Sequence, residues 1–188
     1  PSGNPQPITA APRVTYHPTA SDAGNEPNLL VAFGTGSYLY DTDPGDDQVQ
    51  SIYAIWDKGV QVGDDRDTVL AERTMVTSTV DGANVRLSEG DDINYEQKRG
   101  WYVDLPSDFE RVITGAQIIG DFIFVNSMIP DVNPCVPGGT GWLMAFGPDG
   151  KTPQNRAFLE FASSIVGYQV QGIPSESGFI YLDGQLYR

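Results

Sequence analysis

The sequence predicts an all-β protein, and three observations support this. The 188-residue chain contains 21 glycines and 14 prolines, and both residue types interrupt helices. Only residues 64–81 run for more than 13 positions without either type, whereas globular helices average about 11–12 residues. Short apolar or alternating runs recur between clusters of turn residues, which is the pattern of strands.

Four strands are expected in the first part of the chain. Residues 29–33 are a compact apolar run that ends at the small residues 34–36, and residues 51–56 are rich in β-branched and aromatic types. Residues 74–80 alternate, so that the even-numbered side chains share one face. Residues 101–105 alternate in the same way, with tryptophan, valine and leucine on one face.

Four further strands are expected in the second part. Residues 122–125 are fully apolar, as in a strand that is buried on both faces. Residues 142–146 lead into the turn residues Pro148-Asp149-Gly150. Residues 179–182 and 185–187 flank Asp183-Gly184, which predicts a tight hairpin with a type I′ turn.

Many short strands with regular turns indicate a β-sandwich, a barrel or a propeller. A propeller blade takes about 40–45 residues, so the chain has the length of roughly four blades. Small residues at positions 34–36 and 138–141 recur at similar strand ends, which indicates weak internal repetition. We therefore predict part of a β-propeller with roughly four blades, each a four-stranded antiparallel sheet. The sandwich stays open as the alternative.

The charge of the chain limits its partners. With 25 acidic and 11 basic residues, the net charge is −14, and residues 41–110 carry 17 of the acids. Nucleic-acid binding needs a field of lysine and arginine that is missing here, and anionic membranes are disfavoured for the same reason. No apolar run of about 18 residues predicts membrane insertion. The acidic surface is interpreted as solvated, and cation binding within part of it is the alternative.

Single copies of histidine and cysteine limit the chemistry. A Ser-His-Asp or Cys-His site would have to use His17, which lies in no familiar catalytic context. Cys135 has no partner for an internal disulfide and belongs to no CxxC zinc pattern. We interpret Cys135 as a buried or free thiol, or as one that pairs with another segment in an oxidising compartment. The sequence starts without a methionine, a basic n-region or an apolar h-region, so we expect it to be a mature or excised piece of a longer protein.

Eight short segments together form a more specific pattern than any one of them. They are residues 5–12 (PQPITAAP), 30–39 (LVAFGTGSYL), 50–57 (QSIYAIWD), 99–106 (RGWYVDLP), 110–112 (ERV), 129–130 (IP), 133–135 (NPC) and 138–143 (GGTGWL). In this order and spacing, they resemble the C-terminal propeller of the PilY/PilC family of type IV pilus tip-associated adhesins and biogenesis factors. The resemblance covers residues 5–174.

The resemblance implies a bacterial protein at the pilus tip or cell surface, or in the outer membrane or periplasm in transit. It implies a non-enzymatic adhesin and assembly module whose partners are minor pilins and a host or abiotic surface. In this family a variable N-terminal region precedes the propeller. Residues 1–188 are therefore expected to be the C-terminal portion of a PilY-like propeller domain. The propeller would be an incomplete ring, and a separate upstream segment would be a further partner.

Two other functions remain as alternatives. One is an enzyme on a propeller scaffold, either a quinoprotein-like dehydrogenase or a glycoside hydrolase, the latter needing two carboxylates about 5–9.5 Å apart. The other is a purely structural cap that locks a tip complex by strand pairing.

Calcium is the one cofactor that the resemblance implies, because PilY-type propellers carry an EF-hand-like loop. The stretch most similar to such a loop contains Asp41, Asp43, Asp46 and Asp47. Its spacing lacks the ligand pattern of a complete EF-hand, including the distal glutamate. These four aspartates are the candidate calcium ligands within the chain, and a site upstream of it is the alternative.

The remaining motif residues are expected to have structural roles. Trp56, Trp101 and Trp142 are predicted to pack between blades, and a sugar-binding platform is the alternative for any one of them. Gly34 and Gly36 are predicted to permit a sharp turn beside a packed strand. A phosphate-binding role lacks a nearby lysine and a following helix.

Overall fold

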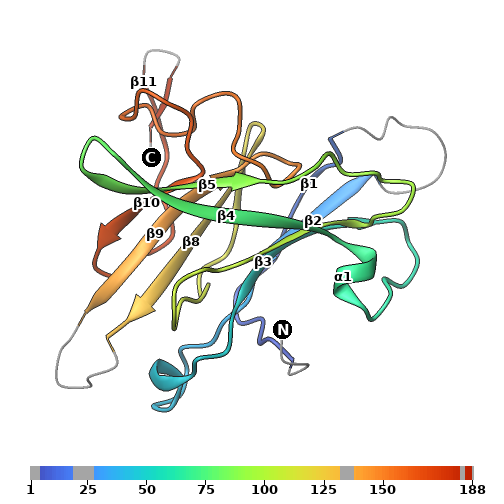
Figure 1. The fold of residues 1–188 in the computed structure, drawn as a ribbon, viewed down its shortest axis with the longest axis horizontal. Coiled ribbons are helices and arrows are strands. Elements are labelled where there is room, and N and C mark those ends of the chain that lie inside the picture. The colour runs from blue at the N-terminus through green and yellow to red at the C-terminus, as the bar shows by residue number, and fades with distance from the viewer. Residues whose placement is uncertain (1–4, 19–27, 132–137, 183–184, 188) are drawn as a thin grey trace.

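Ten strands of the chain join in one curved sheet, and two more form a separate hairpin (Figure 1). The computed structural model describes residues 5–18, 28–131, 138–182 and 185–187. The strands are β1 (Arg13–Tyr16), β2 (Leu29–Gly34), β3 (Ser51–Asp57), β4 (Ala71–Val80), β5 (Ala83–Glu89), β6 (Gly100–Asp104), β7 (Gln117–Ile119), β8 (Phe122–Pro130), β9 (Gly139–Phe146), β10 (Gly167–Gln171), β11 (Ile180–Leu182) and β12 (Gln185–Tyr187). The helical elements are the 3-10 turn η1 (Asp43–Gly45) and the one-turn helix α1 (Arg66–Val69). Among the described residues, no helix is long and apolar enough to cross a membrane.

The order of strands in the large sheet is β1-β2-β3-β6-β4-β5-β10-β9-β8-β7. Although β1 and β7 are at opposite ends of this order, their Cα atoms approach within 8 Å. The sheet therefore curls almost into a barrel, and its concave face encloses the main core.

Strand β4 joins two halves of the sheet. Residues Ala71, Glu72 and Arg73 pair in parallel with β6, whereas the stretch from Thr74 to Val80 pairs antiparallel with β5. One half thus contains β1, β2, β3 and β6, and the other contains β5, β10, β9, β8 and β7. Figure 1 shows β4 running across the molecule between the two halves.

Alternation of side chains along the strands places one core inside the sheet and two outside it. The inner core contains Ala32, Ile52, Ala54, Trp101, Val103, Leu105, Val112, Ala116, Ile123, Val125, Trp142, Met144, Phe146 and Val166. On the outer face of β8 and β9, Phe124 and Ala145 pack with Phe158, Phe161 and Ile165. On the outer face of β3 and β6, Tyr53 and Tyr102 pack with Leu70, which follows α1.

The all-β prediction is confirmed, and each of the eight predicted strands overlaps an observed one. The predicted hairpin is present as β11 and β12, while its turn residues Asp183 and Gly184 lie outside the described residues. Strands β1, β5, β7 and β10 are not among these eight. The grouping of strands also differs from four separate four-stranded blades, because β4 pairs on both sides and links the described strands of the large sheet.

Candidate functional site

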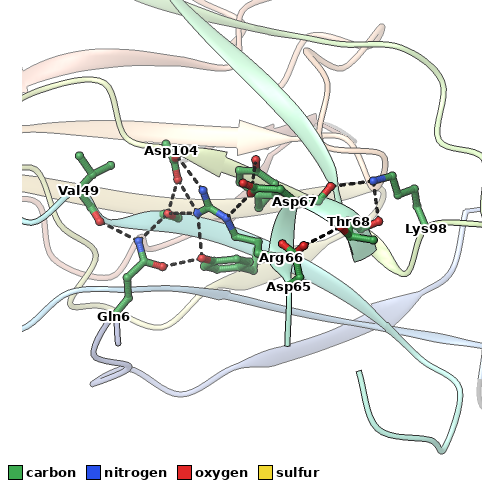
Figure 2. Close-up of polar contacts among 11 residues, drawn as sticks. Gln6, Val49, Asp65, Arg66, Asp67, Thr68, Lys98 and Asp104 are labelled. Atoms are coloured by element: carbon green, nitrogen blue, oxygen red, sulfur yellow. Dashed lines mark hydrogen bonds and ion pairs between the residues drawn. The ribbon is translucent and has the colours of Figure 1, made fainter. Parts of the chain in front are cut away.

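The outer face of β3 and β6 carries an arginine-centred cluster (Figure 2). Arg66, the first residue of α1, donates from Nη1 and Nη2 to the two carboxylate oxygens of Asp104, at 2.8 and 3.1 Å. Nη1 also donates to Ser51 Oγ and to the Tyr53 hydroxyl, each at 3.2 Å. The guanidinium carbon lies 3.8 Å from the centroid of the Tyr102 ring, which adds a cation–π contact. We call these five residues the Arg66 cluster.

Strand register brings the four partners of Arg66 together. In the antiparallel pair of β3 and β6, Ser51 lies opposite Asp104, and Tyr53 lies opposite Tyr102. Because side chains alternate along a strand, all four project from the same outer face. The single turn of α1 then lays the Arg66 guanidinium across them.

A second layer of contacts surrounds the Arg66 cluster. The Gln6 amide donates to Val49 O at 2.7 Å and to Ser51 Oγ at 2.8 Å, and it accepts from the Tyr53 hydroxyl at 2.5 Å. Gln6 therefore fixes the segment that precedes β1 against the outer face of β3. Figure 2 shows this chain of contacts from Gln6 to Arg66.

The helix itself is also held at its exposed side. The Asp67 carboxylate accepts from the Tyr102 hydroxyl at 2.9 Å and from Arg66 Nε at 3.2 Å. Lys98 Nζ donates to the backbone carbonyls of Asp67 and Thr68, at 2.9 and 2.8 Å. A cation at the carboxyl end of a helix satisfies carbonyls that have no partner within the helix.

The pKa shifts of Arg66, Tyr102 and the neighbouring Asp67 keep the arginine charged, the tyrosine neutral and the aspartate ionised. Burial opposes the charge on Arg66, but hydrogen bonds to Asp104 and Tyr53 outweigh it and raise the pKa of the guanidinium. Burial, followed by the hydrogen bond to Asp67, raises the pKa of Tyr102. The hydrogen bonds from Tyr102 and Arg66 lower the pKa of Asp67. All three nitrogens of Arg66 already donate hydrogen bonds within the chain. The arrangement therefore holds α1 against the outer face of the sheet, and no pKa shift in it activates a nucleophile.

A second arginine lies inside the sheet. The guanidinium of Arg86 in β5 donates to both carboxylate oxygens of Glu110, at 2.6 and 2.7 Å, and neither side chain is exposed to solvent. Ser107 accepts from Arg86 at 2.9 Å, and Ser127 donates to Glu110. The guanidinium also lies 3.7 Å from the centroid of the Trp142 ring. This pair fixes the segment after β6 against β5.

The four candidate calcium ligands lie in and around η1, and one of them, Asp43, accepts several hydrogen bonds from its own loop. Asp43 Oδ2 accepts from Ser37 Oγ and from the backbone N–H of Leu39, each at 2.7 Å, and from that of Tyr40 at 3.1 Å. These hydrogen bonds, that of Ser37 first, lower the pKa of Asp43.

The backbone carbonyls of the same loop hold a guanidinium. Arg111 donates to the carbonyls of Ser37 at 3.1 Å, of Asp46 at 2.8 Å, and of Asp43. Asp41 and Asp47 are exposed. Across the described residues, no group of three or more histidine, cysteine, aspartate or glutamate side chains is placed to hold a metal ion. This arrangement does not fit a calcium centre, and the assignment of Asp41, Asp43, Asp46 and Asp47 stays a prediction.

An open cavity of about 1000 Å³ lies beside the loop that follows β9. Its lining includes Asp92, Tyr95, Asp121, Asp149 and Lys151. Lys151 Nζ contacts Asp92 at 2.7 Å and lowers the pKa of that carboxyl. Burial, followed by the charge of Asp149, raises the pKa of Tyr95 to about 12.

The single histidine is packed among aromatic rings. Its centroid lies 4.2 Å from that of Trp56 and 4.1 Å from that of Tyr95. Burial, followed by the charge of Lys58, lowers the pKa of His17. Cys135 lies outside the described residues.

All three tryptophans are buried, and their packing between blades stays a prediction. Trp101 and Trp142 are buried in the inner core and Trp56 is buried beside His17. A Cβ at Gly34 would lie 2.5 Å from the Val112 side chain. This glycine therefore permits the close approach of the segment after β6, as expected of residues beside a packed strand.

Sequence reasoning did not identify Arg66, Arg86 or Arg111 as organising residues. Arg111 and Glu110 stand in the 110–112 motif, where two adjacent charges beside a valine gave a usable signal. Both are buried, and Val112 joins them in the interior. Arg66 and Arg86 have partners 38 and 24 positions away in the chain, so no local pattern indicates them.

Comparison with known proteins gives consistent results. No protein-family model matches the chain. A PilY1 homolog of Xylella fastidiosa, named as a type IV pilus biogenesis factor, is 29% identical over 149 residues, covering 76% of this chain. The type IV pilus biogenesis factor PilY1 of Pseudomonas aeruginosa is 27% identical over 205 residues, covering 96% of this chain. The chain spans 10% and 16% of the lengths of these two relatives.

The fold also matches a solved structure. The crystal structure of the P. aeruginosa PilY1 C-terminal domain superposes with a TM-score of 0.68, covering 93% of this chain and 41% of that one. At 20% identity, this match shows a shared fold. The resemblance to the PilY/PilC family and the propeller-like fold class are thereby confirmed.

Proposed function

We propose that this chain, as a relative of the C-terminal region of PilY1, serves type IV pilus biogenesis by binding other proteins. The observation that carries this proposal is the sequence similarity to PilY1 proteins, which extends over 76–96% of the chain. The similarity is spread along the chain and is not confined to one motif. The match to the PilY1 C-terminal domain over 93% of the chain supports it.

The chemistry of the described residues favours binding over catalysis. A glycoside hydrolase needs one carboxyl whose pKa is raised so that it can act as an acid. The aspartates with shifted pKa values here, Asp43, Asp67 and Asp92, all have lowered values because they accept hydrogen bonds. The arginines of the Arg66 cluster and the Arg86 pair are likewise engaged with neighbouring groups of the chain. Together with the names of the PilY1 relatives as pilus biogenesis factors, this supports a non-enzymatic role as part of the proposal.

We further propose that the chain lies on the cell surface at the pilus tip. There it would contact minor pilins and take part in adhesion to a host or abiotic surface. The net charge of −14 favours partners with basic patches. A companion PilY-like segment would complete the domain, since the chain covers 41% of the matched structure.

Deletion and complementation test this function in the bacterium that encodes the chain. We expect deletion of the gene to remove surface pili, counted by electron microscopy, while the major pilin is still made. The intact gene should restore them, and minor pilins should co-purify with its product. Normal piliation of the deletion strain would contradict the biogenesis role. Turnover of quinone-linked dyes or nitrophenyl glycosides by the purified chain would contradict the non-enzymatic role.

A further inference from the structure

The distal half of β4 has one edge without a partner strand among the described residues. The stretch from Thr74 to Val80 pairs with β5 along one edge. On the other edge, β6 accompanies β4 only at residues 71–73, and then ends at Asp104. The described part of the chain places no further strand beside this edge. Seven consecutive residues thus present one row of backbone donors and acceptors away from β5.

The side chains of this stretch are open to solvent. Val76 is 42% exposed, and Thr74, Thr77, Ser78 and Thr79 are also exposed. Met75 and Val80 are half-buried and contact the inner and outer cores, respectively. Figure 1 shows this part of β4 continuing into the hairpin with β5 at the periphery of the molecule.

The residue types of the stretch from Thr74 to Val80 favour strand formation, and none of them hinders another strand from pairing at the free edge. The stretch reads TMVTSTV, and six of its seven residues are threonine, valine or methionine. Threonine and valine have high β-propensity. Natural sheets protect open edges with charges, prolines or bulges, yet this stretch has no charged residue, no proline and no glycine.

We propose that the free edge of Thr74–Val80 is a docking site for an extended β-strand of another polypeptide. Such strand addition takes its affinity from backbone hydrogen bonds and its specificity from alternating side chains. The partner strand would place a small apolar side chain opposite Val76. Opposite Thr77 and Thr79 it would place side chains that carry a hydroxyl group or are β-branched.

The charges around the edge define the partner further. Glu72 and Asp81 stand at the two ends of the stretch, and Glu89 lies opposite Thr74 on β5. All three are exposed. A partner strand with lysine or arginine at its ends complements them, whereas a second copy would bring together two chains of net charge −14. The inference rests on this geometry alone and holds whether or not the chain serves pilus biogenesis.

Peptide binding tests the inference. The probe is a synthetic peptide of three Thr-Val repeats between two lysine pairs, titrated against the full chain at low salt. We expect binding, and we expect the peptide to slow hydrogen exchange at amides of residues 74–80. A matched peptide with N-methyl groups on alternate residues keeps its charge but cannot complete the ladder. It should bind about a hundredfold more weakly, since it loses three hydrogen bonds of about 1 kcal/mol each and every 1.4 kcal/mol is a factor of ten.

Two protein variants localise the effect. Val76→Lys puts a positive charge on the proposed edge, and Val60→Lys puts the same charge on a valine that is 63% exposed elsewhere. We expect Val76→Lys to lower the affinity for the lysine-flanked peptide and Val60→Lys to leave this affinity unchanged. Equal melting temperatures would confirm that both variants fold. Equal affinity for the N-methylated peptide, or no protection at residues 74–80, would overturn the proposal. So would a stable dimer in ultracentrifugation whose protected amides map to the same stretch. None of these assays involves a pilus, so they can fail independently of the piliation test.

Discussion

Arg86 and Glu110 form a two-point ion pair inside the curled sheet, with no solvent exposure of either side chain. The pair joins β5 to the segment that follows β6, two parts of the chain that no strand pairing connects. Two serine hydroxyls and the face of Trp142 surround the pair, whereas Arg86 Nε is buried without a hydrogen-bond partner among the described residues. A buried pair of this kind holds the two segments in one arrangement, and removal of one partner is costly mainly because the other charge stays buried and unpaired.

We predict that Glu110→Gln lowers the free energy of unfolding by about 3–5 kcal/mol, because it leaves Arg86 charged and unpaired in the core. The double variant Arg86→Met with Glu110→Leu should cost much less than either single change. Urea denaturation followed by tryptophan fluorescence measures both. If the double variant were as unstable as the single one, the loss would come from packing and not from an isolated charge.

The close contact of Gly34 with Val112 gives a steric prediction. A methyl group at Gly34 would lie 2.5 Å from the Val112 side chain, so Gly34→Ala should destabilise the chain by about 1–3 kcal/mol. Val112→Ala should recover part of this loss in the double variant. Gly178→Ala serves as the control, because a Cβ at Gly178 meets no atom within 4 Å. The melting temperature of each variant is the measurement, and equal melting temperatures for Gly34→Ala and Gly178→Ala would contradict the prediction.

The strands with clear alternation or a continuous apolar run were predictable from the sequence, and those that depend on distant partners were not. Strand β5 has Arg86 at a core-facing position, which breaks the apolar pattern, and its charge there is balanced by the distant Glu110. Strand β7 has three residues, too few for a periodic signal. Pairing of β4 with both β5 and β6 is likewise a long-range outcome, and it replaces four separate blades with two joined halves.

The Arg66 cluster could not be predicted for the same reason. Its partners come from β3 and β6, which pair although α1, β4 and β5 lie between them in the chain. The aspartates at 41–47 form the most visible acidic run in the sequence. The structure nevertheless directs the carboxylate of Asp43 to its own loop, and a distant arginine takes the loop carbonyls.

His17 makes stability depend on pH in a way that one substitution can isolate. Burial and Lys58 lower its pKa below the ordinary value of 6.5. As the pH falls through that value, the unfolded chain takes up a proton that the folded chain does not, so the free energy of unfolding decreases. We expect His17→Phe to reduce this decrease between pH 7 and pH 5 in urea denaturation series. As His17 is the only histidine, an unchanged slope would contradict the assignment.

Asp43 is predicted to order its loop without calcium. Its carboxylate accepts three hydrogen bonds from residues 37–40, so Asp43→Ala should speed hydrogen exchange at the amides of Leu39 and Tyr40. The exposed Asp47 provides the control, and Asp47→Ala should leave those rates unchanged. We expect the same result in excess calcium and in chelator. Protection that appeared only with calcium would instead favour the metal assignment of this loop.

Arg66 offers the sharpest test of how the outer face is held, because lysine can replace its charge but not its geometry. The planar guanidinium bonds both oxygens of Asp104 while it covers the Tyr102 ring, and an ammonium group cannot do both. We predict that Arg66→Gln and Arg66→Lys each cost about 1–2 kcal/mol in unfolding free energy. Both should also speed exchange at the amides of Val69 and Leu70, which close the turn of α1. Arg13→Lys, on the exposed strand β1, is the control. If Arg66→Lys behaved like the parent chain, charge alone would be sufficient to hold α1, and the two-point contact with Asp104 would have no separate role.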